Sequence, residues 1–449
     1  MKKIISKFSI IVILFAMLFP LYHSMHVTSA ESSVTTESDE LIVNGDFSTQ
    51  SYWTKSSNAT YDKDNKCFQI TKNGGYIIST ISTDNSKQNL VSKVKQGFYK
   101  ISFKMWKSEE KDAAITVLFA IKSTNVETIV KEFTIEVSKN KPAFSSCFYF
   151  YKSSQEDYLQ LKIKSTTQEC SSIYIDDVSL VQITTPIETE TGASIRNSST
   201  DSGLRFRGNI NKGVYDYLAA TYGEANVKAG MLLTPTNLIT DVDDFTIEKL
   251  ENNNVTYLNK FIEKWNNSST VETDGYYGFN CVIANIKPEN LDRKFSARAY
   301  VSYKVSNDET TYIYADYSSE NHSRSIYEVA SKALESDLID ENLRAVAKNY
   351  VNRIINLNAD GFEKDSIDTT GMTYIITKNY NKGVLYCSVP EGVTVLVKNN
   401  DSKLEAIQNL YYSLSNTENN IKIQLTFNNL TESKIQEKLN EIVIKFYVA

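Results

Sequence analysis

Two adjacent aspartates, Asp176 and Asp177, stand in the middle of the alternating segment IYIDDVSL, which covers residues 173–180. Alternation of apolar and polar residues is typical of a β-strand, on which successive side chains point to opposite faces. Aspartate is a poor strand former, and a carboxylate that leaves water needs a compensating partner. The pair therefore indicates either carboxylates that bind a cation or a carboxylate that caps backbone amides at a β-bulge.

Outward-facing aromatic residues are a second group that suits a particular chemistry. In FYKISFKMW, alternation places Trp106 on the polar face of a strand, among lysine and serine neighbours. The segments FSSCFYFYK and DYLQLKIK place Tyr149, Tyr151 and Gln160 on outward faces in the same way. Such residues suit sugars, because a pyranose ring stacks on an aromatic face while amides bind its hydroxyls. We take these four residues as candidate carbohydrate-binding residues, with ordinary surface packing as the alternative for the tyrosines.

Histidine is scarce in this chain. Of the three histidines, His23 and His26 lie in the N-terminal segment described below, which leaves His322. One histidine excludes a histidine-rich zinc site, and we expect His322 to be a polar loop side chain rather than a catalytic base. The sequence also has no P-loop, dinucleotide-binding fingerprint, zinc signature or nucleophile elbow. No catalytic residue is assigned, and if the chain is an enzyme we expect a hydrolase of glycosyl bonds.

Cysteine and arginine complete the side chains with specific chemistry. The cysteines have no CxxC spacing and are too few for a disulfide framework, although one bridge among the first three stays open. They are Cys67, Cys147, Cys170, Cys281 and Cys387. All eight arginines lie between Arg196 and Arg353. Since the guanidinium fork matches carboxylates, we expect a network with nearby acids, and an anion site is the alternative.

The N-terminus has the order of a secretory signal: three lysines, an apolar run from Ile10 to Leu21, and small residues up to Ala30. We expect residues 1–30 to be removed and the product to be secreted, extracellular or held at the cell surface, with cell-wall association left open. No later stretch is apolar for long enough to span a bilayer. The formal net charge of −6, more negative still without those lysines, argues against a nucleic-acid partner.

The first domain must position most of these candidates. Between residues 41 and 183, seven or more short alternating segments are separated by turn residues, which predicts an antiparallel β-sandwich, most simply a jelly roll. We expect a linker over 31–40 before it and an extended, proline-containing linker over 184–193 after it. The fold class is therefore multidomain, with a jelly-roll β-sandwich followed by an α+β region.

The α+β region divides into 194–358 and a C-terminal α+β segment over 359–449, which either forms a third domain or completes the second. Amphipathic patterns predict helices within 212–223, 245–265 and 325–357, the last with a break near residues 337–340. In the C-terminal segment we expect five strands, with helices around KLEAIQNLYYSL (403–414) and SKIQEKL (433–439).

A resemblance covers nearly the whole first domain. LIVNGDFS (41–48) followed by Trp53, then GFYKISFKMW, then IYIDDVSLV, resembles the family 4 and 9 type carbohydrate-binding modules of secreted glycoside hydrolases. It implies a galactose-binding-like jelly roll that binds sugar and keeps Trp53 in its core. It also implies a structural calcium held by Asp176 or Asp177, with Asp46 nearby. Ser48 departs from the family, which often has an acid there.

A second resemblance covers residues 192–335, where GYYGFNCVIANIKPENLDRKFSARAYVSYK and TYIYADYS are similar to an uncharacterised extracellular domain of Gram-positive surface and polysaccharide-degrading proteins. It implies no activity. Three functions follow as hypotheses: a protein that docks on polysaccharide through its sandwich, a glycoside hydrolase with an appended binding module, or a structural or adhesive surface protein that binds protein. Apart from calcium, no cofactor is expected.

Overall fold

The computed structural model describes most of the chain after its N-terminal segment. The described residues are 37–42, 44–71, 73–79, 96–108, 113–123, 126–137, 143–150, 158–166, 172–196, 202–262, 270–273, 275–306, 309–356, 363–368, 371–380, 383–399, 402–406, 409–414, 419–427 and 432–448. The expected signal segment, Tyr151 and Cys170 lie outside these ranges. Within them, no helix combines the length and the apolar character needed to cross a membrane.

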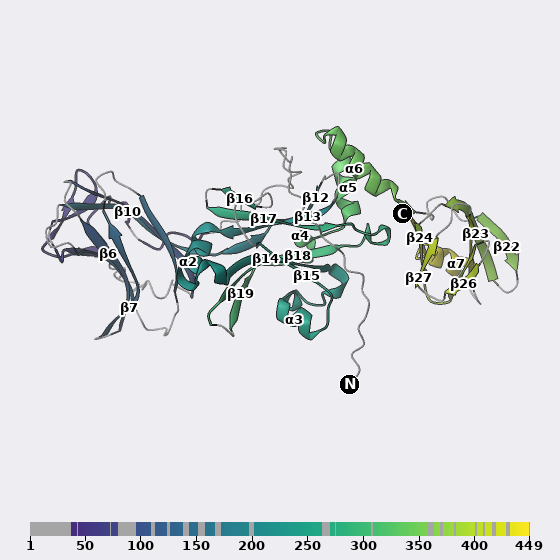
Figure 1. The fold of residues 1–449 in the computed structure, drawn as a ribbon, viewed down its shortest axis with the longest axis horizontal. Coiled ribbons are helices and arrows are strands. Elements are labelled where there is room, and N and C mark those ends of the chain that lie inside the picture. The colour runs from purple at the N-terminus through teal and green to yellow at the C-terminus, as the bar shows by residue number, and fades with distance from the viewer. Residues whose placement is uncertain are drawn as a thin grey trace.

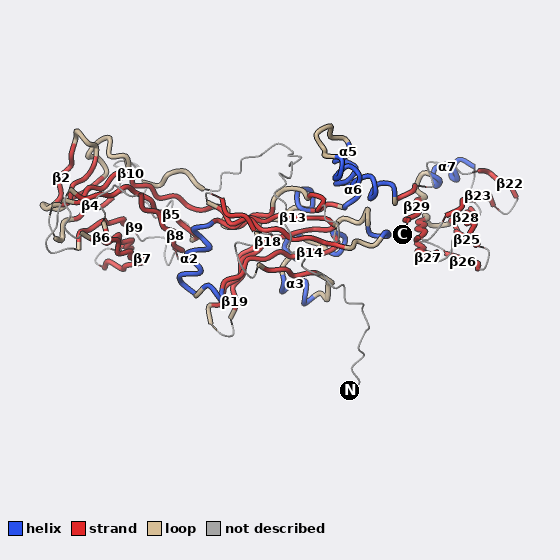
Figure 2. The backbone as a smooth tube through the Cα atoms, turned by 45° about the horizontal axis from the view of Figure 1, so that its top comes forward, coloured by secondary structure: helices blue, strands red, loops and turns tan. Residues whose placement is uncertain are grey.

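Three pairs of β-sheets follow one another along an elongated molecule (Figure 1). The first pair lies at one end, the second in the middle, and the C-terminal pair at the other end. The helices lie mainly around the middle pair, and strands dominate elsewhere (Figure 2).

The first domain is a sandwich of two five-stranded antiparallel sheets, which confirms the predicted jelly-roll sandwich. Its strands are β1 (Trp53–Lys55), β2 (Ala59–Asp62), β3 (Cys67–Ile70), β4 (Tyr76–Ser79), β5 (Gly97–Lys107), β6 (Ala114–Ser123), β7 (Val126–Glu136), β8 (Ala143–Phe150), β9 (Tyr158–Ser165) and β10 (Ile173–Ile183). The β5 sheet has the order β2-β3-β10-β5-β8, and the β6 sheet has the order β1-β4-β9-β6-β7. The chain crosses repeatedly between the sheets, so both contribute one inner face to a common core.

Alternation along each strand sorts its side chains as expected. On β5, Tyr99 and Phe103 are buried between the sheets, whereas Lys104 on the opposite face is exposed. Trp53 packs in the core, where its ring lies 4.9 Å from that of Phe47 in an edge-to-face contact. Its indole N–H donates to a backbone carbonyl at 3.1 Å, so this buried donor has a partner.

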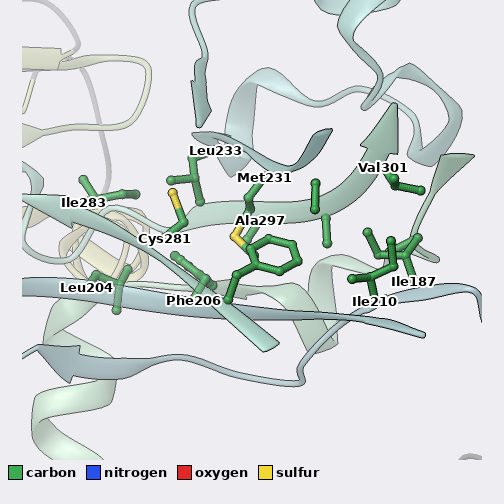
Figure 3. Close-up of a cluster of buried hydrophobic side chains, with 14 of the residues drawn as sticks. Ile187, Leu204, Phe206, Ile210, Met231, Leu233, Cys281, Ile283, Ala297 and Val301 are labelled. Atoms are coloured by element: carbon green, nitrogen blue, oxygen red, sulfur yellow. The ribbon is translucent and has the colours of Figure 1, made fainter. Parts of the chain in front are cut away.

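The middle region is also built on two antiparallel sheets. Its strands are β11 (Ile187–Thr189), β12 (Ser194–Arg196), β13 (Gly203–Asn211), β14 (Val227–Pro235), β15 (Leu258–Phe261), β16 (Thr270–Thr273), β17 (Tyr276–Ala284), β18 (Phe295–Lys304), β19 (Thr310–Tyr314) and β20 (Ser323–Arg324). Figure 3 shows Phe206 of β13 and Cys281 of β17 facing Met231 of β14 and Ala297 of β18 across the core. The expected linker over 184–193 is extended, but its residues Ile187–Thr189 form an edge strand of this region.

Helices add to the middle sheets, as the predicted α+β class requires. They are α2 (Lys212–Tyr222), α3 (Ile247–Asn252), α4 (Ser319–His322), α5 (Ile326–Leu334) and α6 (Glu341–Asn352), with 3₁₀ turns η1 (Glu224–Asn226), η2 (Thr236–Leu238), η3 (Val242–Asp244) and η4 (Pro288–Asn290). The break expected near 337–340 is confirmed, because Asp340 caps the N-terminus of α6. The single helix expected over 245–265 is wrong, since Leu258–Phe261 form β15, paired with β14.

The C-terminal region carries a third pair of sheets with its own buried core. Its elements are β21 (Ile354–Asn356), β22 (Glu363–Asp368), β23 (Gly371–Tyr380), β24 (Gly383–Ser388), β25 (Val393–Asn399), β26 (Ser402–Ala406), β27 (Asn409–Leu414), β28 (Asn419–Phe427), α7 (Glu432–Leu439) and β29 (Val443–Val448). The five expected strands and the helix at 433–439 are confirmed. The helix expected over 403–414 is wrong, because its described residues, 403–406 and 409–414, lie in β26 and β27, which pair with β25 and β24.

The first sandwich and the middle region share one hydrophobic core. Phe98, Cys147 and Ile183 of the β5 sheet are buried in the same cluster as the apolar residues of α2. Figure 2 shows α2 lying beside β8. Residues 37–42, which lie partly within the expected linker 31–40, run along β10. Glu37 of this segment forms an ion pair at 2.9 Å with Lys100 of the neighbouring strand β5.

Candidate functional site

Two aromatic rings stack on the outer face of the β5 sheet. Trp106 of β5 and Tyr174 of β10 are cross-strand partners, with ring centroids 5.1 Å apart and ring planes 11° from parallel. Both are half-buried, while their strand neighbours Met105 and Ile175 are buried between the sheets. The pair therefore presents a rigid aromatic surface on the outside of the sandwich.

Two polar residues extend this pair across the sheet. Gln69 of β3 is the cross-strand partner of Tyr174, and Thr60 of β2 is the partner of Gln69. Thr60, Gln69, Tyr174 and Trp106 thus form one row across four neighbouring strands, which we call the Thr60–Trp106 row. At the usual spacing between strands the row is about 14 Å long, comparable with a short oligosaccharide.

Hydrogen bonds fix the polar half of the row. The Gln69 amide nitrogen donates to the Tyr174 hydroxyl at 3.3 Å and to Ser172 Oγ at 2.8 Å. The Thr60 hydroxyl donates to the Gln69 amide oxygen at 3.3 Å. Since the Tyr174 oxygen accepts in this arrangement, its proton remains available to a ligand, and the Thr60 oxygen can accept from one.

The aspartate pair lies next to this row on the same sheet. Asp176 Oδ1 accepts from the backbone amide of Asp177 at 2.8 Å, and the strand register shifts between Asp176 and Ser179. Asp177 has a left-handed backbone (φ 50°), which turns its carboxylate outward to form an ion pair with Lys104. The hydrogen bond from Lys104 to the Asp177 carboxylate raises the pKa of Lys104, because it stabilises the charged ammonium. In the structure, then, Asp176 caps a backbone amide at a β-bulge.

The surroundings of Asp46 and the aspartate pair bear on whether a calcium ion would fit. The opening loop does lie against the last strand, since Val178 N donates to Gly45 O at 2.8 Å. Asp46 accepts from a backbone amide of its own turn, and Asp177 is paired with Lys104. Among the described residues, no three acid, histidine or cysteine side chains gather as a metal site. The described side chains do not by themselves form a calcium cage, and calcium stays a prediction.

The three described residues among those expected to bind carbohydrate do not lie together. Tyr149 is on the β5 sheet but at its other end, where its ring packs at 4.9 Å against Phe98 beside the middle region. Gln160 lies on β9, in the opposite sheet, and Tyr151 is outside the described residues. Of the three described candidates, only Trp106 belongs to the row. Sequence reasoning missed Tyr174, although alternation in IYIDDVSL puts it on the same face as Asp176.

His322 is a structural residue, which corrects the expectation of a polar loop side chain. It ends α4 and is buried, with an exposed fraction of 8%. Its Nδ1 accepts from Ser318 N at 3.0 Å, and its ring also bonds the backbone of Thr189. Burial lowers its pKa, so the imidazole is neutral near pH 7 and joins α4 to β11.

Two arginines of the middle region, Arg207 and Arg298, are also structural, but acids are only part of their environment. Arg207 pairs with Glu190 at 3.6 Å, as the expected network requires. Arg298, by contrast, donates to backbone carbonyls, with Nε 2.7 Å from Ala315 O and Nη1 3.0 Å from Phe245 O. These contacts satisfy carbonyls at loop and strand ends.

Comparison with known proteins gives no family: no protein family description and no curated protein matches this sequence. Solved structures that resemble it include a family 4 carbohydrate-binding module, 17% identical, covering 31% of this chain and 99% of that one, with a TM-score of 0.24. Another is a family 61 module in complex with β-1,4-galactotriose, 10% identical, with coverages of 32% and 99% and a TM-score of 0.23. The family 22 xylan-binding domain of Paenibacillus barcinonensis is 15% identical, with coverages of 32% and 95% and a TM-score of 0.24. The description of the fold rests on the strand pairing above rather than on these similarities.

Proposed function

We propose that this chain binds polysaccharide through the outer face of its β5 sheet, centred on the Thr60–Trp106 row. The single observation that carries the proposal is the in-register row itself: a stacked indole and phenol continue into an amide and a hydroxyl. A glycan needs both parts, because its rings have apolar C–H faces while its edges carry hydroxyls.

Preorganisation of the row favours binding. The Trp106 and Tyr174 rings are held by stacking, and the Gln69 amide is held by its hydrogen bonds. Little side-chain freedom is therefore left to lose when a ligand binds, and this loss is a main cost of association.

The charges beside the row favour a neutral polysaccharide. Lys104, two residues before Trp106 on the same face of β5, is compensated by the Asp177 carboxylate. A polyanion would have to break this pair or leave its own charges without partners, and the acidic chain as a whole would repel it.

The test is retention of the full chain on insoluble polysaccharides. Trp106→Ala and Tyr174→Ala should abolish retention on the polysaccharide that binds the unaltered chain, with little change in melting temperature. Tyr76→Ala is the matched control, because Tyr76 lies on the outer face of the β6 sheet beneath Lys162. Normal retention of both row variants, or loss in the Tyr76 variant alone, would contradict the proposal.

A role at a polysaccharide agrees with export from the cell, which the order of residues in the N-terminal segment favours. We include export in the proposal: mature protein collected from the medium should begin after Ala30. Full-length protein retained in the cytoplasm would contradict this part and leave the binding face untouched.

A further inference from the structure

A polar cleft lies where the middle region meets the C-terminal region, far from the Thr60–Trp106 row. Its volume is about 480 Å³, within the range of small-ligand sites. One wall comes from η2 and from the segment around η4 and the residues that follow it. The other comes from β24, β27 and β29 of the C-terminal region.

The base of the cleft is a defined polar contact between the two regions. Asp292 accepts from Lys445 Nζ at 2.5 Å and from the Tyr447 hydroxyl at 3.0 Å. Burial and the nearby carboxylate raise the pKa of Tyr447, so its phenol stays protonated and keeps donating. Asp292 therefore has its charge satisfied within the protein and serves to position the walls.

Other groups in the cleft face it without such partners. In the described part of the chain, the Glu289 carboxylate and the Arg293 guanidinium make no hydrogen bond or ion pair. Lys294, by contrast, pairs with Glu328 at 2.9 Å. The cleft thus offers a carboxylate acceptor and a multi-donor guanidinium among its lining groups.

Two aromatic rings face these charges. Tyr386 and Tyr411 are cross-strand partners on β24 and β27, with ring centroids 4.7 Å apart. Tyr411 is 55% exposed, unusually open for a large ring that lines a cleft. Tyr411, Glu289 and Arg293 line the same cleft, Tyr411 from β27 and the two charged residues from the segment around η4.

We propose that this cleft is a second saccharide-binding site, in which Tyr411 stacks on a sugar ring while Glu289 and Arg293 bind neighbouring hydroxyls. A hydroxyl group both donates and accepts hydrogen bonds. A carboxylate and a guanidinium in one cleft therefore suit two hydroxyls on neighbouring carbons of a sugar. The proposal deepens the proposed function, because a chain with two sites on one polysaccharide gains avidity. The site itself stands on separate residues and does not depend on the row.

The experiment measures binding of cellohexaose, xylohexaose and β-1,4-galactotriose to the full chain by calorimetry. In a Trp106→Ala background, at least one of these sugars should still bind. Adding Tyr411→Ala or Arg293→Ala should weaken that residual binding about tenfold or more, as for a central contact residue. Tyr411→Phe is the matched control, because it keeps the ring and should keep most of the affinity.

The outcomes separate the two sites. If Trp106→Ala removes all binding, or if the residual binding is indifferent to both Tyr411→Ala and Arg293→Ala, the cleft proposal is overturned and the proposed function stands. If Tyr411→Ala weakens binding and Trp106→Ala does not, the cleft is supported and the sandwich face is not. If none of the three sugars binds the unaltered chain, both are contradicted for this class of ligand.

Discussion

Gly213, at the start of α2, lies directly on Cys147 of β8, so that a Cβ on Gly213 would come within 2.2 Å of the Cys147 sulfur. The two residues belong to different regions of the chain, and Cys147 is buried in one cluster with Phe98 and with Val214, the neighbour of Gly213. Glycine is required at position 213, because any side chain there would keep α2 from approaching β8 this closely.

The first prediction concerns this contact. Gly213→Ala should destabilise the chain by about 1–3 kcal/mol, because an extra methyl group must displace buried neighbours. Combining it with Cys147→Ala, which removes the obstructing sulfur, should recover part of the loss. Thermal or denaturant unfolding of the three variants measures this, and additive effects of the two substitutions would contradict direct contact.

The second prediction concerns thiol reactivity. Burial raises the pKa of Cys147, Cys281 and Cys387 to about 12 each, so almost no thiolate exists at pH 8. These three thiols should resist alkylation by iodoacetamide in the native chain and react once it is unfolded. Mass spectrometry of tryptic peptides identifies each site. Rapid native labelling of any of the three would show that its surroundings open in solution.

The third prediction concerns pH. Burial lowers the pKa of His322 from its ordinary 6.5, so the unfolded state binds more protons than the folded state once the pH falls below about that value. Stability contributed by neutral His322 is therefore present above pH 6.5 and is lost as the pH falls. The melting temperature should drop between pH 7 and 5, and His322→Asn should reduce this drop. An equal drop in both proteins would assign it to other groups.

The fourth prediction concerns calcium. If the calcium implied by the resemblance of the first domain binds near Asp46, EGTA should lower the melting temperature of the full chain and added Ca²⁺ should restore it. Asp46→Ala should remove the response. A melting curve unaffected by EGTA would mean that the capping of Asp177 N by Asp176 fully accounts for the aspartate pair.

The fifth prediction compares two glutamines on opposite faces of the sandwich. Gln69→Leu should weaken polysaccharide binding several-fold, because it removes the amide that orients Tyr174 and Thr60. Gln160→Leu, on β9 of the other sheet, should leave binding unchanged. The reverse result in depletion assays would move the binding surface to the β6 sheet.

Local patterns in the sequence predicted much of the fold. Alternation identified the strands of the sandwich and the face of each residue on β5, since burial between two sheets imposes a period of two. The helix break was also predictable from neighbouring residues, because it lies just before Asp340, which caps α6. Where residues 258–261 and 403–414 were expected to be helical, pairing with distant strands overrode the local pattern.

The candidate site was predicted only in part for a related reason. Trp106 stands out because a large ring occupies a polar face of its own strand. Gln69 and Tyr174 gain their significance from a hydrogen bond between residues 105 positions apart in the sequence. The pairing register of strands so far apart in the sequence depends on the whole sandwich. Alternation within a single strand does not determine this register.

The two junctions of this elongated chain differ in strength. The first is a shared hydrophobic core, whereas the second includes the contacts of Asp292 with Lys445 and Tyr447. Under a pulling force along the long axis, polar contacts beside a cleft would rupture before a buried core is torn open. A chain anchored at its two ends would therefore extend first near Asp292, while the sandwich and its neighbour stay joined as one stiff arm.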